Sequence, residues 1–485
     1  MGPGLPWKGT AYVWPAFPII FVVTPVPTAT PAPAPATRAF FWGRAYHRIM
    51  KIALINSRDD VAGCNIRRHI GQCLADAPGD EKGRTYEFVE VSGRLIHAEG
   101  IDAGLDAELV IFLSRHSSVN PVPVLTVHAT GNYGAAELGG SPRTLAPAAP
   151  AMMQATLRAL ARHCPEGYRV SYEVTHHGPT GLSLPSFFVE IGSTEREWAD
   201  PVAGRAVAEA VLGADPAGAV PLIGIGGTHY APRETAIALS TRGAFGHIAS
   251  SRLQVALLDR DLVRAMVVQS GAVGAYIDRK AVTPADFTRV SGILGELGIP
   301  RLSETEIASL GHLPWETYRE VRALAETAGP GTRCFVHALE GSGPLALISL
   351  DPVLLAEAKR CDEPALIQGF GPLPVAHLAT EDNVLLPQFV VFASHSSEII
   401  NALNTLCVKI IRNRESTATE NGYLVIRKVR FDPQKARELG VPAGPAYRQL
   451  AAGQAVEQDG RVITPDRVSV VTETRIHIPG LENYP

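Results

Sequence analysis

The chain has 485 residues, of which 46% are hydrophobic and 19% are charged, and its formal net charge is −4. This length is enough for two or three domains with their own cores, and the composition is that of an ordinary globular protein. The net negative charge excludes a protein that coats nucleic acid by electrostatics alone, although it allows one that grips a single end of an RNA.

The first 49 residues differ in composition from the rest of the chain. They contain no acidic residue, and residues 25–36 (PVPTATPAPAPA) form a tract that cannot build a core. Lys8 and the apolar run at 11–23 allow a signal peptide, but Pro15 and Pro18 interrupt that run. We favour a disordered leader or a mis-assigned start, because Met50 opens an apolar stretch typical of a first buried strand.

Residues 50–303 alternate between apolar runs of strand length and amphipathic runs of helix length. This alternation predicts an α/β domain with helices on both faces of a mixed, mostly parallel sheet. The predicted strands are residues 51–56, 109–114, 122–129, 169–175, 186–191 and 220–225. The predicted helices are residues 148–163, 202–212, 252–267 and 284–297.

Residues 304–485 are expected to form a smaller α+β C-terminal extension, with an apolar strand at 389–393. The boundary is placed near residue 303, where the alternation of strands and helices thins out. A cluster of Lys and Arg in this extension either contacts a tRNA backbone or forms a solvated surface. Its members are Lys409, Arg412, Arg414, Arg427, Lys428, Arg430, Lys435 and Arg437.

The six cysteines are scattered along the chain, and no C-x-x-C pair occurs. This spacing fits neither a zinc ribbon nor the disulfide framework of a secreted domain. A reduced, cytoplasmic compartment is therefore the simplest interpretation.

Histidines gather in the predicted α/β domain, where seven of the 15 lie between His116 and His247. They occur in polar motifs that follow apolar strands, and ligands bind beyond the carboxyl ends of strands in open α/β sheets. Imidazole is the commonest zinc ligand, and zinc activates water at neutral pH. We expect one or two zinc ions, with His128, His176, His177 and His229 as candidate ligands. The candidate catalytic residues are those four histidines together with His116 and Glu190.

Two further sequence features allow other kinds of chemistry. Ser117 or Ser118 beside His116 is a possible nucleophile, but no G-x-S-x-G motif accompanies them. The glycines of residues 224–227 (GIGG) either cradle a phosphate or oxyanion or simply form a tight turn. The usual patterns of a dinucleotide site and of a P-loop are both absent from this stretch.

Five motifs in chain order carry a resemblance to a known family: SRHSS (114–118), VHATGN (127–132), THHGPT (175–180), FVEIGST (188–194) and GIGGTHYAPR (224–233). Together they resemble the archaeal and plant-type D-aminoacyl-tRNA deacylases over residues 50–300. The resemblance implies hydrolysis of the ester between a D-amino acid and the 3′ end of tRNA, zinc dependence, and a phosphorylase- and peptidyl-tRNA-hydrolase-like α/β fold.

The same resemblance defines the expected partners. The substrate is the acceptor end of D-aminoacyl-tRNA, and we expect no DNA and no membrane as partners. The sequence leaves the oligomeric state open, a monomer included. A nucleoside phosphorylase-like enzyme and a non-catalytic tRNA-binding protein are the alternatives. The residues expected to bind the substrate or the tRNA are Arg115, Asn132, Thr180, Gly226, Gly227 and Arg233.

Overall fold

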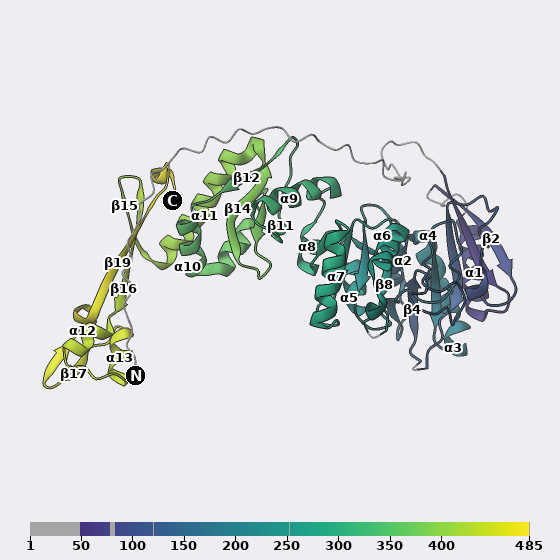
Figure 1. Cartoon of the computed structure of the whole chain (residues 1–485), viewed down its shortest axis with the longest axis horizontal. Coiled ribbons are helices and arrows are strands. Elements are labelled where there is room, and N and C mark those ends of the chain that lie inside the picture. The colour runs from purple at the N-terminus through teal and green to yellow at the C-terminus, as the bar shows by residue number, and fades with distance from the viewer. Residues whose placement is uncertain (1–48, 78–82, 120, 252, 485) are drawn as a thin grey trace, which may run out of the picture. The chain divides into compact units, whose positions relative to one another are not determined.

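The structure, a computed structural model, describes residues 49–77, 83–119, 121–251 and 253–484 (Figure 1). The predicted leader therefore lies outside the described residues, except for Ile49. Within the described ranges, no helix is both long enough and apolar enough to cross a bilayer.

The first sheet has six strands, and its central strands are buried on both faces, as their nearly continuous apolar sequences require. Neighbouring strands run parallel, except that β4 runs antiparallel to β6. The order across the sheet is β2 (Arg84–Val91), β1 (Met50–Ser57), β3 (Leu109–Arg115), β6 (Ser186–Gly192), β4 (Val124–His128) and β5 (Arg169–Tyr172).

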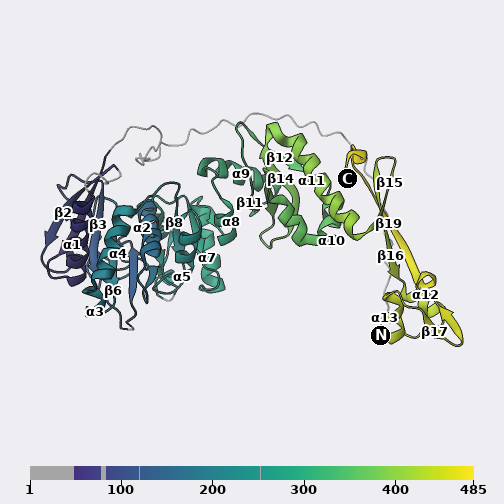
Figure 2. The same ribbon diagram turned by 180° about the vertical axis from the view of Figure 1, so that it is seen from behind.

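Three helices pack side by side against one face of this sheet, namely α1 (Val61–Asp76), α4 (Pro201–Gly213) and α2 (Pro150–His163) (Figure 2). The carboxylates of Asp60 and Asp200 cap α1 and α4 by accepting hydrogen bonds from backbone N–H groups. The other face packs against Leu95, Leu182 and neighbouring turns instead of long helices. The expectation of helices on both faces is therefore not met for this sheet, because its second face is covered by irregular chain.

A second sheet, fully parallel, replaces the single sheet that was expected. Helix α2 contacts strands of both sheets, so it separates them and prevents one continuous sheet. The strand order is β10 (Arg301–Leu302), β9 (Gly274–Ile277), β7 (Val220–Ile225) and β8 (Gly243–Ala249). The connecting helices are α5 (Pro232–Ser240), α6 (Arg260–Ser270) and α7 (Pro284–Glu296).

Helix α6 begins later than the sequence pattern predicted. Asp259 accepts a hydrogen bond from the backbone N–H of Leu262 and caps the helix there, and Val255–Leu257 forms a separate 3-10 turn. Arg252, where the predicted helix began, lies outside the described residues. The other three predicted helices agree with the structure to within two residues at each end.

The strands after residue 302 pair antiparallel, in three further sheets. One apolar core joins Leu302 to Val390 and Phe392, so the domain boundary near residue 303 remains a prediction. The strands are β11 (Arg333–Val336), β12 (Leu345–Ser349), β13 (Ala376–Ala379), β14 (Leu385–Phe392), β15 (Ser416–Glu420), β16 (Tyr423–Phe431), β17 (Val456–Gln458), β18 (Arg461–Ile463) and β19 (Ser469–His477). The helices are α8 (Glu304–Ser309), α9 (Trp315–Ala328), α10 (Pro352–Phe370), α11 (Ser396–Arg414), α12 (Pro433–Glu438) and α13 (Pro445–Ala451).

Candidate active site

A buried carboxylate, Glu173, lies at the centre of the histidine cluster. Its Oε1 atom is 2.8 Å from His116 Nδ1 and 2.9 Å from His229 Nε2. Its Oε2 atom is 3.1 Å from His128 Nδ1, an ion-pair distance at which neither atom makes a well-aligned hydrogen bond. One carboxylate therefore contacts three imidazoles that come from separate strand ends.

The register of the first sheet explains why these groups meet. Val127 of β4 lies opposite Tyr172 of β5, so that His128 and Glu173 follow at neighbouring positions. Chain segments after β3 and β7 then bring His116 and His229 to the same carboxylate. Sequence spacing alone does not reveal this convergence, because it depends on which strands are neighbours.

Three histidines form a second group, whose ring nitrogens converge. The ligand atoms of His128, His176 and His177 all lie within 4.8 Å of one another. His176 Nδ1 is 2.7 Å from the carbonyl oxygen of Val174, and His177 Nδ1 is 2.6 Å from that of Gly178. A carbonyl oxygen only accepts, so each Nδ1 carries the hydrogen and each Nε2 presents a free lone pair.

The donor set of this group fits zinc. His128 Nδ1 faces a carboxylate and so carries a hydrogen as well, which leaves its Nε2 free. That Nε2 is 3.2 Å from His177 Nε2, and two lone pairs at this distance repel unless a cation lies between them. Tetrahedral zinc with Zn–N distances of about 2.0–2.1 Å places two ligand nitrogens about 3.3–3.4 Å apart. Each ring is also oriented by an acceptor at Nδ1, as is usual for metal-binding histidines.

The adjacent His176 and His177 both face His128 because the loop changes direction between them. The ring centroids of His176 and His177 lie 4.5 Å and 4.9 Å from that of His128. His177 has a φ of +48°, which residues other than glycine rarely adopt and which is common at functional sites. The loop thus directs two consecutive side chains to one point.

The two buried carboxylates of the cluster have pKa values shifted in opposite directions. Burial raises the pKa of Glu190, and the charge of Glu173 adds to this effect. Burial also opposes ionisation of Glu173, but contacts with His116, His128 and His229 outweigh it and hold the pKa of Glu173 well below its usual range. Glu173 is therefore the charged member of the pair, and Glu190 retains a proton more readily.

The pKa values of the histidines are also shifted in opposite directions. Burial lowers the pKa of His116, but hydrogen bonds to Glu173 and Glu190 and their charges raise it to about 11. Burial lowers the pKa of His176 to about 3 and that of His177 well below its usual range. The pair that faces His128 is thus neutral, which is the form that binds metal.

All six predicted catalytic residues lie in or beside this cluster. Glu190 Oε2 is 3.7 Å from His116 Nδ1, and the ligand atoms of His128, Glu173 and Glu190 lie within 4.8 Å of one another. Glu173 was not among the predicted site residues, although it is an acidic residue in a predicted strand, two positions before the start of the THHGPT motif. Tyr230, whose hydroxyl is 3.0 Å from His116 Nε2, was not among them either. Since both ring nitrogens of His116 are engaged, neither is left to activate Ser117 or Ser118.

The predicted substrate-binding residues have different surroundings. Asn132 and Thr180 are buried and form hydrogen bonds with the backbone at Gly139 and Ser141, so they hold two loops together. The guanidinium of Arg115 stacks over the ring of Trp198 at 5.1 Å and forms no ion pair with any described residue.

The remaining members of this set lie after β7. Gly226 and Gly227 have φ values of +114° and +82° and form the turn that hydrogen-bonds to Ala249 and Ser251. Arg233 forms an exposed ion pair with Glu304 at 3.3 Å. A contact of any of these residues with substrate remains a prediction.

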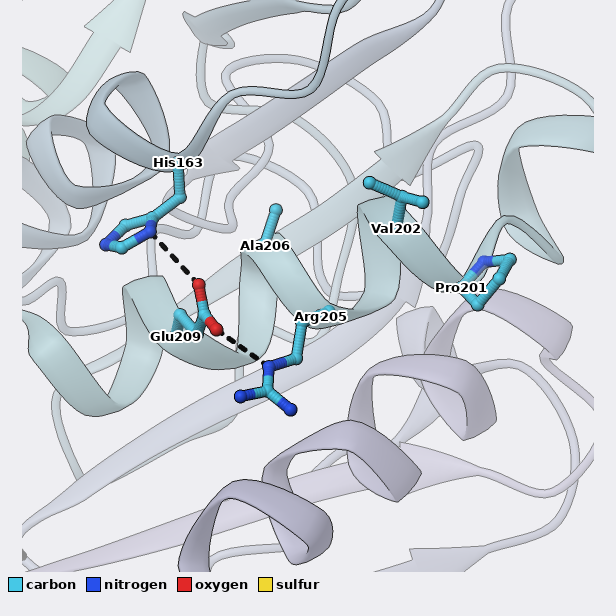
Figure 3. A pocket seen from close by; sticks show the side chains of 6 residues that line it. All are labelled: His163, Pro201, Val202, Arg205, Ala206 and Glu209. Atoms are coloured by element: carbon cyan, nitrogen blue, oxygen red, sulfur yellow. Dashed lines mark hydrogen bonds and ion pairs between the residues drawn. The ribbon is translucent and has the colours of Figure 1, made fainter. Parts of the chain in front are cut away.

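A surface depression of about 330 Å³ lies along α2 and α4, away from the predicted residues (Figure 3). Its charged side chains pair with one another, because Glu209 contacts His163 at 3.1 Å and Arg205 at 2.7 Å. The depression therefore offers no unpaired charge to a ligand.

Three members of the basic cluster form ion pairs with carboxylates. Arg414 contacts Asp362, Arg427 contacts Glu420 and Glu473, and Lys428 contacts Glu357. For these three side chains the pairing favours the solvated-surface interpretation over a phosphate-binding one.

The chain is similar to known D-aminoacyl-tRNA deacylases. A family profile described as D-aminoacyl-tRNA deacylase matches residues 103–302. A D-aminoacyl-tRNA deacylase of Methanoregula boonei is 87% identical over 435 residues, which are 90% of this chain and the whole of that protein. One from Methanoculleus marisnigri is 52% identical over 437 residues, with the same coverage. The crystal structure of AF0625, a conserved protein of unknown function, is 35% identical over 53% of this chain and 96% of that one, with a TM-score of 0.49.

Proposed function

This chain belongs to the D-aminoacyl-tRNA deacylase family and hydrolyses the ester of D-aminoacyl-tRNA, and we propose that zinc held by His128, His176 and His177 assists this reaction. The observation that supports the zinc assignment is the convergence of ring nitrogens from these three histidines within 4.8 Å of one another, each on a ring whose Nδ1 faces an acceptor. The family assignment favours this activity over a nucleoside phosphorylase or a non-catalytic tRNA-binding protein.

The protein groups around this site have distinct roles in the proposal. Zinc, when bound, supplies a Lewis acid that makes water a nucleophile at neutral pH. Glu173 orients His128 and remains charged, as carboxylates behind metal-binding histidines do. Glu190, buried beside His116, is placed to exchange a proton with the attacking water. His229, the fourth predicted ligand, contacts Glu173 and belongs to a second candidate set with His116 and Glu173.

The contacts with substrate are proposed from the charge and the surroundings of the side chains near the cluster. Arg115, held flat on Trp198 next to His116, is placed to bind a phosphate of the tRNA acceptor end. Preference for the D-enantiomer would come from the shape of the pocket, which rejects the L side chain. We also propose a phosphorylase- and peptidyl-tRNA-hydrolase-like relationship for the α/β part, and a cytoplasmic setting, which suits the six free cysteines.

The test uses the full chain with D-tyrosyl-tRNA and L-tyrosyl-tRNA, with and without a chelator, and measures the zinc bound per chain. We expect release of D-tyrosine only, loss of activity with chelator, and recovery with zinc. One zinc per chain supports the three-histidine site, and a second would place an ion at His116, Glu173 and His229. Full activity in a preparation shown to be free of metal would contradict the zinc proposal.

A further inference from the structure

A chain of polar contacts leads from the buried carboxylate to the surface of the site. Glu173 is fully buried, His116 is 4% exposed, and Tyr230 is partly exposed. The contact distances are 2.8 Å from Glu173 Oε1 to His116 Nδ1 and 3.0 Å from His116 Nε2 to Tyr230 Oη. The outermost residue of this chain is therefore Tyr230.

The direction of these contacts follows from what each atom can donate. The carboxylate of Glu173 only accepts, so His116 Nδ1 carries a hydrogen. Burial lowers the pKa of His116, but hydrogen bonds to Glu173 and Glu190 and their charges raise it to about 11, so Nε2 also carries a hydrogen and donates it to the hydroxyl oxygen of Tyr230. The phenol hydrogen is then free for an acceptor in the substrate, and the imidazolium behind the hydroxyl can replace a proton that the phenol gives away.

The surrounding residues hold His116 and Tyr230 in place. The indole N–H of Trp198 donates to the carbonyl oxygen of His116 at 2.9 Å. The ring of Tyr230 lies 5.7 Å from that of His116 and 5.3 Å from that of His229. Thr228 and His229, which precede Tyr230 after β7, are exposed, so a substrate can reach this loop.

We propose that Tyr230 is a catalytic residue of the deacylation, whose phenol contacts the ribose oxygen of the ester and protonates it as the ester breaks, with His116 and Glu173 as its positioning residues. This inference rests on the deacylase activity and adds the group that serves the leaving oxygen. A ribose alkoxide is a poor leaving group, and protonation of such an oxygen by a positioned side chain contributes about 10²- to 10⁴-fold.

In this step water adds to the ester carbonyl carbon, the bond from that carbon to the ribose oxygen breaks, and its electron pair stays on the ribose oxygen. Tyr230 gives its proton to that oxygen and regains one from His116. The proton lost by the attacking water passes to Glu190, which lies 3.7 Å from His116 Nδ1, and from there restores the ring. The products are the free D-amino acid and the 3′-terminal hydroxyl of tRNA, and no oxidation or reduction occurs.

The first test compares the full-chain variants Tyr230→Phe and Tyr168→Phe. Tyr168 is the matched control, because it is likewise a partly exposed tyrosine whose hydroxyl contacts a side chain, that of Asp200 at 2.8 Å, outside the histidine cluster. For Tyr230→Phe we expect kcat on D-tyrosyl-tRNA to fall by about 10²-fold or more, with KM and bound zinc unchanged. Tyr168→Phe should retain the wild-type kcat. A Tyr230→Phe kcat close to that of the wild type would overturn the proposal, as would an equal loss in both variants.

A second test keeps the proposal falsifiable if Tyr230→Phe does not fold. His116→Gln should lower kcat to a similar extent while zinc remains bound, and the double variant should lose no more than the more impaired single variant, because the groups act as a unit. Losses that multiply in the double variant, or loss of zinc in His116→Gln, would overturn it. An inactive wild-type protein would instead refute the deacylase activity itself, so the two failures are distinguishable.

Discussion

Three buried carboxylates of the parallel-sheet part and two surface carboxylates of the C-terminal part have contrasting surroundings. In the parallel-sheet part, Glu173, Glu190 and Glu234 are buried, and no described Lys or Arg forms an ion pair with them. In the C-terminal part, Arg427 and Arg475 lie at the surface and share contacts with Glu420 and Glu473. These three buried carboxylates thus lie apart from Lys and Arg, whereas the two surface carboxylates of the C-terminal part are paired with Arg.

This difference supports the histidine cluster as the candidate site. A buried carboxylate without a cation is costly, so a fold retains one only where surrounding groups compensate or where function uses it. Exposed ion pairs cost little and contribute little to stability. If this difference reflects function, substitution of the buried carboxylates should change activity or stability, and substitution in the exposed ion pairs should not.

The largest effect is expected for Glu173→Gln. The amide cannot carry the charge that orients three imidazoles, so we expect kcat to fall at least about 10²-fold and zinc affinity to fall about 10- to 100-fold. The control is Glu357→Gln, which removes an acidic group paired with Lys428 in the C-terminal part and should leave kcat unchanged. Steady-state kinetics measure kcat, and zinc titration measures the zinc affinity. Equal losses of kcat in the two variants would contradict the proposed difference between buried and paired carboxylates.

A smaller effect, on stability, is expected for Glu234→Gln. Burial raises the pKa of Glu234 to about 8, and neither of its oxygens has a hydrogen-bond partner. Because the folded pKa exceeds the unfolded one, the unfolded chain ionises first, and stability is lost as pH rises from about 4.5 to 8. At about 1.4 kcal/mol per pKa unit, the loss is at most about 5 kcal/mol.

The variant removes this loss, so its free energy of unfolding should exceed that of the wild type at pH 8 and match it at pH 4. Denaturant titrations at the two pH values measure this difference. A gain that is equal at both pH values would show that the carboxylate is not the group responsible.

A weaker effect is expected for Arg115→Ala. If Arg115 binds a tRNA phosphate, KM for D-tyrosyl-tRNA should rise about tenfold, and the salt dependence of KM should become shallower. A minimal substrate without that phosphate, 3′-O-D-tyrosyl-adenosine, should be cleaved equally well by variant and wild type. If cleavage of both substrates is impaired equally, Arg115 serves the chemistry or the fold instead of the tRNA.

The smallest effect is expected for Arg427→Ala in the exposed ion-pair network of the C-terminal part. Glu420 and Glu473 keep Arg475 as a partner, so kcat and KM on D-tyrosyl-tRNA should remain at wild-type values. A clear rise in KM alone would show that this surface contacts tRNA and would revive the phosphate-binding interpretation of the basic cluster.

Sequence patterns located the elements of the parallel-sheet part but not their arrangement. The predicted strand at 220–225 has the bounds of β7, since an apolar run between turn residues is a local signal. The division into two sheets and the reversed direction of β4 depend on pairing between distant segments, which no local pattern encodes. Glu173 was missed for the same reason, because its importance lies in the strand beside it.

The histidines of the site were easier to find than its other members. Those in motifs with Gly, Thr or Ser at strand ends all reached the cluster, because such motifs mark chain ends that face a common edge. His247, in the same region, instead contacts Thr175 and the carbonyl oxygen of Ala146 inside the core. Residue type therefore predicted the candidate histidines, and strand register determines which side chains lie in the cluster.

Gly192 gives this centre a marker that can be read from sequence. A β-carbon added there would lie 2.6 Å from Cδ2 of His116, so any larger side chain would displace the imidazole. During divergence, a change at this glycine and a change at His116 should therefore occur together. In newly sequenced relatives, a chain that keeps the histidine but carries alanine at this position would be expected to have lost the arrangement, and with it the activity, even where every other motif remains.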